Sequence, residues 1–395
     1  MKDAYIIDAI RTPIGNFGGT LAAVRTDDLA ALVINELVKR NPTLNQEVIE
    51  DVLFGCANQA GEDNRNVARM AGLLAGLPWR VGGETVNRLC ASGMAAAINA
   101  SRAIKIGDGD LYISGGPYVI SKSAKPFGTD SKMYDSSFGW RFINPKMEQL
   151  YGTDGMGQTA ENLVDMYKIS REDQDKFAYW SQMKATKAQQ SGRLAEEIVV
   201  VEIPQRKKDP IIFTQDEFIK PTTSLEILGK LAPAFRKEGG SVTAGNASGL
   251  NDGAAAMLIA SEEAAKQYNL QPMARIVSSA IAGVEPRIMG IGPVYATEKA
   301  LKRAGLTLDQ MDVIEINEAF AAQSLACTRK MGLADDDPRI NPNGGAIALG
   351  HPLGMTGSRI LQTAAIELHK QNKKYALVTL CIGVGQGYAT ILERV

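Results

Sequence analysis

Apolar residues recur with two different periods along the chain, and together they predict an alternation of helices and strands. Apolar positions three and four apart indicate amphipathic helices at about residues 29–40 and 297–304. Short apolar runs at 111–114 and 375–380 indicate buried strands. Because such segments alternate, we predict an α/β fold in which helices cover mixed sheets.

The same order of elements occurs twice. Aligning the chain with itself at an offset of 261 residues places Cys90 on His351 and Gly93 on Gly354. Each copy has a helix, a strand and a second helix, followed by a helix that opens at Cys90 or at His351 and then by a buried strand. Equivalent helix N-termini that face each other would bring Cys90 and His351 to one site.

A stretch of different composition separates the two copies. Residues 117–241 carry charge clusters and scattered aromatic residues, which is typical of an inserted loop or lid domain. Within it we predict one long amphipathic helix over about residues 161–193. Residues 241–253 are rich in small residues and suit a close approach of backbone to a ligand. The predicted units are an N-terminal half (1–116 with about 242–266), the insert (117–241) and a C-terminal half (267–395).

Composition and charge are those of an ordinary soluble globular protein. The 395 residues, of which 45% are hydrophobic, suffice for two or more structural units. The 43 basic and 44 acidic residues nearly balance, which argues against nucleic acid or an anionic membrane surface as a partner. No signal peptide is readable, and the longest uncharged tract, 375–392, predicts a strand, a loop and a strand rather than a membrane span. We therefore expect a cytoplasmic protein.

The four cysteines differ in their surroundings. They show neither a zinc pattern nor a disulfide framework, so we predict free thiols and no metal site. Cys56 and Cys327 lie in apolar contexts and are expected to be inert. Cys90 lies where a polar-flanked strand gives way to a helix of small residues. Unpaired N–H groups and the positive end of the helix dipole would stabilise its thiolate.

Cys90, His351 and Cys381 form a set suited to covalent catalysis on sulfur. A histidine supplies the base that generates a thiolate at neutral pH. A second thiol, with an ordinary pKa of about 8 to 9, gives or takes a proton in a later step. Cys381 begins the string CIGVGQG, which is similar to a dinucleotide-binding loop but lacks the helix and the acidic residue that should follow.

Four motifs in this order closely resemble those of the thiolases, the acyl-CoA C-acyltransferases. They are NRLCASG around Cys90, NEAF from Asn317, NPNGGAIALGHPLG around His351 and CIGVGQG from Cys381. The resemblance covers essentially the whole chain and implies a duplicated, layered αβαβα fold with an inserted loop domain. It also implies acyl-CoA and CoA as co-substrates, no permanently bound cofactor, and a homodimer or homotetramer.

The resemblance gives each residue of the set a role. Cys90 would accept the acyl group as a thioester, His351 would activate Cys90, and Cys381 would shuttle the substrate α-proton. Asn317 would orient a water that forms one oxyanion hole with His351, and the backbone N–H groups of Cys90 and Gly383 would form the other. Loss of one good donor typically costs about 3 to 4 kcal/mol of barrier.

For the CoA moiety, the resemblance implies a second set of residues. Ser248 and Ala244 would lie near the pantetheine, Met156 and Phe320 would line its channel, and Lys220 would lie near the nucleotide. The chain departs from the family pattern after Gly116, where a Glu and a Met usually follow and Pro117 stands instead. About seven residues are missing there relative to the pattern, so either the segment at the entrance is shortened or the sequence lacks a piece of the natural chain.

The stretches GCANQAGEDNRNVARMA and GWRFINP are especially similar to bacterial 3-oxoadipyl-CoA (β-ketoadipyl-CoA) thiolases of aromatic-acid breakdown. That substrate ends in a carboxylate, and these stretches carry two candidate cations for it, Arg65 and Arg141. A structural role, or a role at a subunit interface, is as consistent with both arginines as recognition of the carboxylate. An alternative function, that of an acetoacetyl-CoA or general 3-ketoacyl-CoA thiolase of fatty-acid metabolism, remains open. So do a ketosynthase-like condensing enzyme, which would lack Cys381, and a non-catalytic acyl-CoA binder, which would have lost Cys90 or His351.

Overall fold

The computed structural model describes residues 2–122 and 139–395, which form one ten-stranded mixed sheet and a separate two-stranded hairpin. The large sheet has the order β10 (Val313–Ile316), β11 (Tyr375–Ile382), β12 (Gln386–Arg394), β9 (Ala274–Gly283), β1 (Ala4–Arg11), β8 (Asn251–Ser261), β5 (Leu111–Val119), β3 (Asp51–Gly55) and β4 (Glu84–Val86), with β2 (Gly15–Asn16) paired to β8. The strands predicted at 111–114 and 375–380 are confirmed as parts of β5 and β11. The predicted succession of strand, loop and strand at 375–392 is also confirmed, by β11 and β12.

The two copies of the duplicated sequence occupy opposite ends of this sheet. β1, β8, β5, β3 and β4 form the N-terminal half, and β9, β12, β11 and β10 form the C-terminal half. The halves are joined through a short antiparallel contact in which Tyr5 lies opposite Arg275 and Ile6 lies opposite Ala274. Both halves mix parallel and antiparallel pairs, as predicted: β3 with β5 and β10 with β11 are parallel, whereas β8 with β5 and β12 with β11 are antiparallel.

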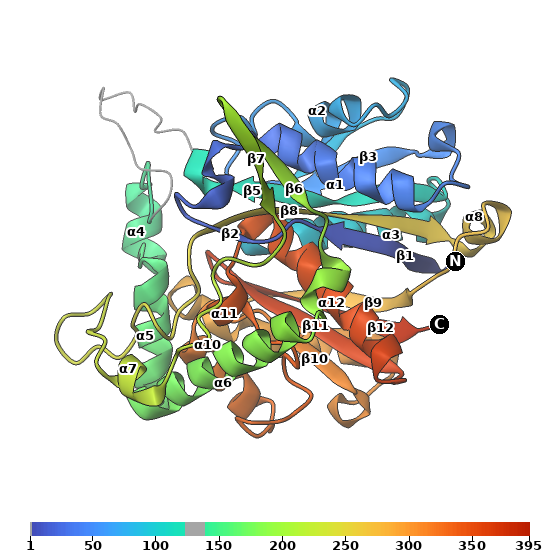
Figure 1. Ribbon diagram of the computed structural model, residues 1–395. Coiled ribbons are helices and arrows are strands. Elements are labelled where there is room, and N and C mark those ends of the chain that lie inside the picture. The colour runs from blue at the N-terminus through green and yellow to red at the C-terminus, as the bar shows by residue number, and fades with distance from the viewer. Residues whose placement is uncertain (1, 123–138) are drawn as a thin grey trace.

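Helices form the layers above, between and below the two halves of the sheet (Figure 1). α3 (Ser92–Ile106) and α12 (Leu353–Lys370) pack against each other between the halves, in a cluster that includes Met94, Ile259, Ile360 and Leu380. α1 (Thr26–Arg40) and α2 (Val67–Leu74) cover the outer face of the N-terminal half, and α9 (Gly292–Ala304) covers that of the C-terminal half. This order of layers is the predicted αβαβα arrangement. α3 and α12 are buried on nearly all sides, which explains their small and apolar residues.

The region between the two copies lies along one side of the molecule (green in Figure 1). It contains α4 (Pro145–Tyr151), α5 (Met156–Tyr167), α6 (Arg171–Gln190), the hairpin of β6 (Val201–Gln205) and β7 (Lys208–Phe213), and α7 (Leu225–Gly229). The α-helices α8 (Glu262–Gln267), α10 (Ala321–Lys330) and α11 (Ala346–Leu349) belong to the two halves.

Two sequence predictions for this region are corrected. The single helix predicted at 161–193 is two helices, because Lys168 adopts a left-handed conformation (φ 53°) that ends α5. Ser170 then begins α6 by accepting a hydrogen bond from the N–H of Asp173. In addition, β5 continues to Val119, so residues 117–119, predicted as the start of the insert, lie in the sheet.

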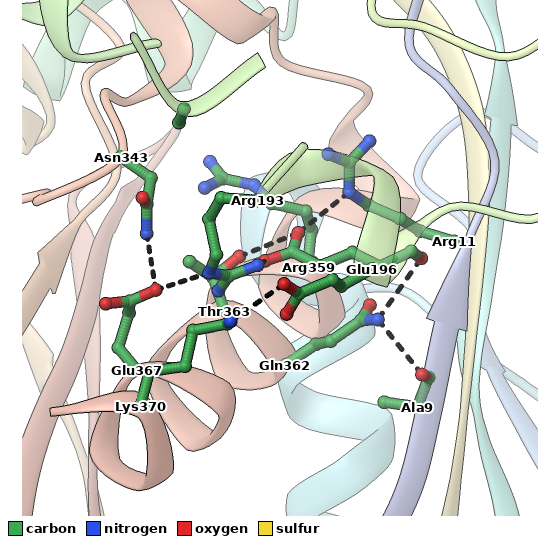
Figure 2. Close-up of polar contacts among 12 residues, drawn as sticks. Ala9, Arg11, Arg193, Glu196, Asn343, Arg359, Gln362, Thr363, Glu367 and Lys370 are labelled. Atoms are coloured by element: carbon green, nitrogen blue, oxygen red, sulfur yellow. Dashed lines mark hydrogen bonds and ion pairs between the residues drawn. The ribbon is translucent and has the colours of Figure 1, made fainter. Parts of the chain in front are cut away.

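Buried ion pairs tie this region to both halves of the sheet. Figure 2 shows Arg193, which follows α6, beside Glu367 of α12, with Arg11 approaching from β1. Glu197 pairs with Arg193 at 2.8 Å and with Arg11 at 3.0 Å, and Asp216 pairs with Arg11 at 2.7 Å. The side chains of Arg11, Glu197 and Asp216 are withdrawn from solvent. Each therefore depends on its partners for compensation of its charge.

Candidate active site

The N-terminal ends of α3 and α12 are in close contact where Gly93 of α3 meets Gly354 of α12. A Cβ placed on Gly93 would lie 2.5 Å from the carbonyl oxygen of Gly354, and one on Gly357 would overlap the backbone of Met94. The helices can approach this closely because these positions have no side chain. Cys90 and His351 each stand three residues before one of the paired glycines. The crossing therefore brings both residues to the same end of the helix pair, as the internal repeat predicted.

Cys90 itself lies in a short 3-10 turn, Leu89–Ala91, that precedes α3. α3 begins at Ser92, so the prediction that the helix opens at Cys90 is correct to within two residues. Ser92 fixes the turn, since its hydroxyl accepts from the N–H of Arg88 at 2.9 Å and donates to the carbonyl of Leu89 at 2.7 Å. Leu89 has a φ of 48°, a strained conformation for a residue with a side chain. Such strain is common where a backbone presents a reactive group.

Two backbone N–H groups converge on the sulfur of Cys90, its own and that of Gly383. Gly383 follows β11. A Cβ added to Gly383 would lie 3.4 Å from the side chain of Leu89 and 3.8 Å from that of Met156, so both side chains are its neighbours. Burial nevertheless raises the pKa of the Cys90 thiol, and the two N–H groups oppose this only in part. The backbone N–H groups thus favour the thiolate, as expected, but desolvation outweighs them in the free protein, and Cys90 is a thiol until a base removes its proton.

His351 is buried and held in one tautomer. Its Nδ1 lies 2.7 Å from Oγ1 of Thr356, and that hydroxyl donates its proton to the carbonyl of Pro352 at 2.8 Å. Nδ1 must therefore carry the hydrogen, which leaves the lone pair on Nε2. Burial, with a smaller contribution from the charge of Arg359, lowers the pKa of His351 to about 3. His351 is thus neutral at physiological pH, with Nε2 able to accept a proton.

Thr356 and Asn251 were not predicted from the sequence. Thr356 fixes the His351 tautomer, and Asn251 accepts a hydrogen bond from the backbone N–H of His351 at 3.0 Å. A hydroxyl in the first turn of the helix after His351 was the available signal for Thr356. No sequence pattern pointed to Asn251, because it lies 100 residues from His351 along the chain.

Asn317 and Glu318 connect the end of β10 to the loop that carries His351. Nδ2 of Asn317 lies 3.3 Å from Nε2 of His351, and Asn317 Oδ1 is buried without a hydrogen-bond partner in the described part of the chain. A buried carbonyl of this kind suits a bound water. Glu318 accepts from Ser181 at 2.6 Å, from Asn341 at 2.7 Å and from the N–H of Ile347 at 3.2 Å. It therefore holds the loop before His351 in place.

Cys381 lies at the end of β11, fully buried in a cluster with Phe320, Ala319 and Ala160. Burial raises the pKa of its thiol well above the ordinary value, and the neighbouring Cys90 raises it further. The two sulfurs are thus close enough to influence each other's titration. A protonated thiol beside a nucleophile can serve as a general acid.

The residues expected near CoA differ in their exposure to solvent. Phe320 is buried and meets Phe235 edge-on at a centroid distance of 6.0 Å, and Met156 lies partly exposed near Gly383. Ser248, partly buried, is joined to the segment before Phe320 by its N–H, which donates to the carbonyl of Ala319 at 3.0 Å. Two further candidates, Ala244 and Lys220, are exposed, and Lys220 lies over the ring of Phe218 at 4.9 Å.

Comparison with known proteins identifies the architecture. Residues 4–263 match the model of the thiolase N-terminal domain, and residues 270–394 match that of the thiolase C-terminal domain. The chain belongs to the thiolase family. It is therefore an acyltransferase, and the predicted resemblance is confirmed.

Several named thiolases are similar to this chain over nearly their full lengths. The beta-ketoadipyl-CoA thiolase of Acinetobacter baylyi is 58% identical, and the 3-oxoadipyl-CoA/3-oxo-5,6-dehydrosuberyl-CoA thiolase of Escherichia coli K12 is 59% identical, each over 100% of both chains. The crystal structure of the Bacillus anthracis acetyl-CoA acetyltransferase superposes with a TM-score of 0.92 at 40% identity, covering 100% of this chain and 99% of that one. The predicted fold class is confirmed by this agreement.

The thiolase alignments also bear on β5. They span 402 positions, seven more than the 395 residues of this chain, which accords with the residues missing after Gly116 relative to the family pattern. β5 is nevertheless regular here, with Gly116 opposite Ala255 and Pro117 opposite Ala254 on β8. The strand therefore continues without a break through the position where the family pattern departs.

The two candidate cations lie in different surroundings. Arg141 is partly buried, and its Nη2 donates to Oδ1 of Asn58 at 3.1 Å, in the loop that follows β3. Arg65 is exposed, in a left-handed conformation (φ 64°) just before α2. Of the two arginines, Arg141 is the more buried.

The remaining cysteines are buried and unreactive. Burial raises the pKa of Cys56 and of Cys327 to about 12 in each case, which keeps both as thiols. Within residues 2–122 and 139–395, no cluster of three or more His, Cys, Asp or Glu side chains could hold a metal ion. The helices of that same part of the chain are all too short or too polar to cross a membrane.

Proposed function

We propose that this thiolase cleaves 3-oxoadipyl-CoA with CoA to acetyl-CoA and succinyl-CoA, through an acyl-enzyme on Cys90, in the breakdown of aromatic compounds. The observation that carries the chemistry is the convergence of Cys381 and the N–H of Gly383 on Cys90 at the end of the helix pair that also bears His351. The substrate is supported by the relatives. Those named for β-ketoadipyl-CoA or 3-oxoadipyl-CoA are 54–59% identical, against 47% for an acetyl-CoA acetyltransferase of Syntrophomonas wolfei.

In the first half-reaction, Nε2 of His351 takes the proton of Cys90, and the thiolate attacks the 3-oxo carbon. The bond between C2 and C3 breaks, which leaves the acyl group on Cys90 and releases the enolate of acetyl-CoA. His351, now protonated at Nε2, donates to the enolate oxygen together with a water held by Asn317. Cys381 protonates the enolate carbon, a role suited to a thiol whose raised pKa keeps it protonated until that step.

In the second half-reaction, the Cys381 thiolate removes the proton of the incoming CoA thiol. The CoA sulfur attacks the acyl-enzyme carbonyl, whose oxygen lies between the N–H groups of Cys90 and Gly383. Collapse of this intermediate transfers the acyl group to CoA, and Cys90 recovers its proton from His351. Both cysteines return to their starting state, so no permanently bound cofactor is required.

We propose that CoA reaches Cys90 through the side lined by Met156 and Phe320, with Ser248 and Ala244 beside the pantetheine and Lys220 near a phosphate. The exposure of Lys220 and Ala244 and the partial burial of Ser248 suit a ligand that runs from solvent to the nucleophile. A lysine contacts phosphate as a point charge, without the paired hydrogen bonds of an arginine.

We also infer that the protein is a homodimer or homotetramer. β4 forms an edge of the large sheet, and Leu73, Leu74 and Trp79, which precede it in the chain, are large and exposed. Open strand edges and exposed apolar side chains are common at subunit contacts. Light scattering coupled to size exclusion measures the subunit number directly.

The substrate assignment is tested by thiolysis with purified protein and free CoA. We expect kcat/KM for 3-oxoadipyl-CoA to exceed that for acetoacetyl-CoA at least tenfold, about the discrimination that one charged contact provides. Equal or better turnover of acetoacetyl-CoA would retain the thiolase chemistry and assign the protein to general acetyl-CoA metabolism.

The Cys381→Ala variant should slow both stages of the reaction without removing the nucleophile. Cys90 and His351 remain, so mass spectrometry should still detect acetylation of Cys90 by acetyl-CoA, but more slowly than in the wild type, because Cys381 no longer protonates the departing CoA sulfur. Thiolysis of 3-oxoadipyl-CoA should fall by roughly 10³-fold, because the enolate loses its proton donor. A variant that retains wild-type thiolysis would contradict the assignment of Cys381.

The Arg141→Ala variant tests recognition of the carboxylate. We expect it to lower kcat/KM about tenfold for 3-oxoadipyl-CoA and little for 3-oxohexanoyl-CoA, which has the same chain length without the carboxylate. Arg65→Ala, which alters an exposed residue, is the matched control and should affect both substrates equally little. Equal losses for both substrates in the Arg141 variant would show a structural role instead.

A further inference from the structure

β5 presents alternate residues to the layer that holds the nucleophile. Tyr112 belongs to the central cluster around α3 and α12, whereas Leu111, Ile113 and Val119 belong to the outer cluster beneath α1. The pairing of β5 with β8 is regular through Tyr118, which lies opposite Gly253. Because successive side chains of a strand point to opposite faces, Tyr118 shares the face of Tyr112 and points into the central layer.

The position of Tyr118 along the strand places it at the reactive end of that layer. β5 starts near the end of α3, where the hydroxyl of Tyr112 bonds the carbonyl of Asp108, and it runs back toward the beginning of the helix. Near its far end, the carbonyl of Pro117 packs against Gly354, three residues after His351. The partner of Tyr118, Gly253, faces the side chains of Met355 and Pro352.

The phenol of Tyr118 lies within electrostatic reach of both the nucleophile and Arg141. The ring is buried, with 5% of the residue exposed. Burial raises the pKa of Tyr118, Cys90 and Asp63 raise it further, and Arg141 opposes them. The hydroxyl therefore remains a hydrogen-bond donor throughout the range in which the enzyme would be assayed.

The surroundings leave this donor available to a ligand. Within the described residues, Tyr118 Oη has no hydrogen-bond partner. The nearby carboxylate of Asp63 is already occupied by the N–H groups of Gln59, Ala60 and Gly61 and by the thiol of Cys56. The hydroxyl oxygen is not among the fully buried atoms that lack a partner, so it keeps contact with solvent and can donate to a ligand that enters from that side.

We propose that Tyr118 is a specificity-determining residue whose ring closes the acyl pocket beside Cys90 and whose hydroxyl donates to the distal carboxylate of a short dicarboxylic acyl chain. This rests on the proposed acyl-enzyme at Cys90. It deepens that proposal by giving Arg141 a neutral partner that shares the carboxylate.

The Tyr118→Phe variant tests this, because it removes the hydroxyl and keeps the ring. We expect kcat/KM for 3-oxoadipyl-CoA to fall about tenfold, the loss typical of one hydrogen bond to a charged group, while that for 3-oxohexanoyl-CoA changes less than twofold. Tyr112→Phe is the matched control, on the same face of the same strand at its other end, and should leave the ratio of the two substrates unchanged. If Tyr118→Phe lowers both substrates equally, or neither, the assignment is overturned.

Two measurements keep the outcome interpretable. Tyr118→Met, which fills most of the volume without a hydroxyl, should give the same change in substrate ratio even if the phenylalanine variant folds poorly. Acetylation of Cys90 by acetyl-CoA, followed by mass spectrometry, tests the underlying function separately in the wild type. Absence of acetylation would overturn the proposed function, whereas normal acetylation with an unchanged substrate ratio in both variants would overturn the role of Tyr118 alone.

Discussion

Replacing Cys90 with alanine should abolish thiolysis. We expect kcat to fall by roughly 10⁴-fold or more, because the reaction loses the atom that carries the acyl group and the remaining groups have no nucleophile to assist. The neutral His351 cannot substitute, since its Nε2 is positioned as a base for the thiol. Steady-state thiolysis of 3-oxoadipyl-CoA and the mass of the protein after incubation with acetyl-CoA measure the two consequences.

The control for Cys90 is Cys327→Ala, which removes a different buried thiol. Cys327 lies in α10, where its sulfur contacts the carbonyl of Gly290 at 3.1 Å. This variant should retain activity within about twofold and still gain the acetyl mass, at the modest loss of stability that a small cavity causes. Acetylation of the Cys90→Ala variant would mean that another residue is the nucleophile.

Replacing Arg11 with alanine should produce the largest loss of stability. It would leave Glu197 and Asp216 buried with part of their compensating charge removed, and breaking a buried pair in this way typically costs about 3–5 kcal/mol. The midpoint of urea unfolding, measured with the slope of the transition, gives the change in free energy. Arg80→Ala is the matched control. Because Arg80 and its partner Glu47 are both more than half exposed, the midpoint should barely change.

The loss in the Arg11 variant should depend on pH. Burial alone would raise the pKa of Glu197, but Arg193 and Arg11 outweigh it and hold the pKa below its ordinary value. In the wild type this charge stabilises the fold above the unfolded-state pKa, and the contribution is lost as pH falls through the folded-state pKa. Without Arg11, Arg193 alone opposes the burial that raises the pKa of Glu197, so the variant is penalised most at neutral pH. The difference from wild type should therefore shrink between pH 8 and pH 5, and an increase would contradict this account.

Local patterns were sufficient for the elements and for the repeat. The strand β11 and the helices α1 and α9 follow from runs and periods that lie within each segment, because burial of one face imposes that spacing. The sequence analysis did not predict the break between α5 and α6. A glycine would have marked the left-handed residue that ends α5, but this position is occupied by Lys168. The extension of β5 through Pro117 was missed for a related reason: a proline in a strand is tolerated where its partner strand places no demand on its N–H.

By itself, the sequence determined the alternation of elements, the duplication and the equivalent positions of Cys90 and His351 before α3 and α12, because these depend on residue types and spacings along the chain. Only the tertiary structure decided how the groups of the site are charged and oriented. The neutral state of His351, the thiol form of Cys90 and the tautomer fixed by Thr356 follow from burial and from hydrogen bonds between distant segments. Desolvation and contact geometry depend on every surrounding element at once, and no local pattern records them.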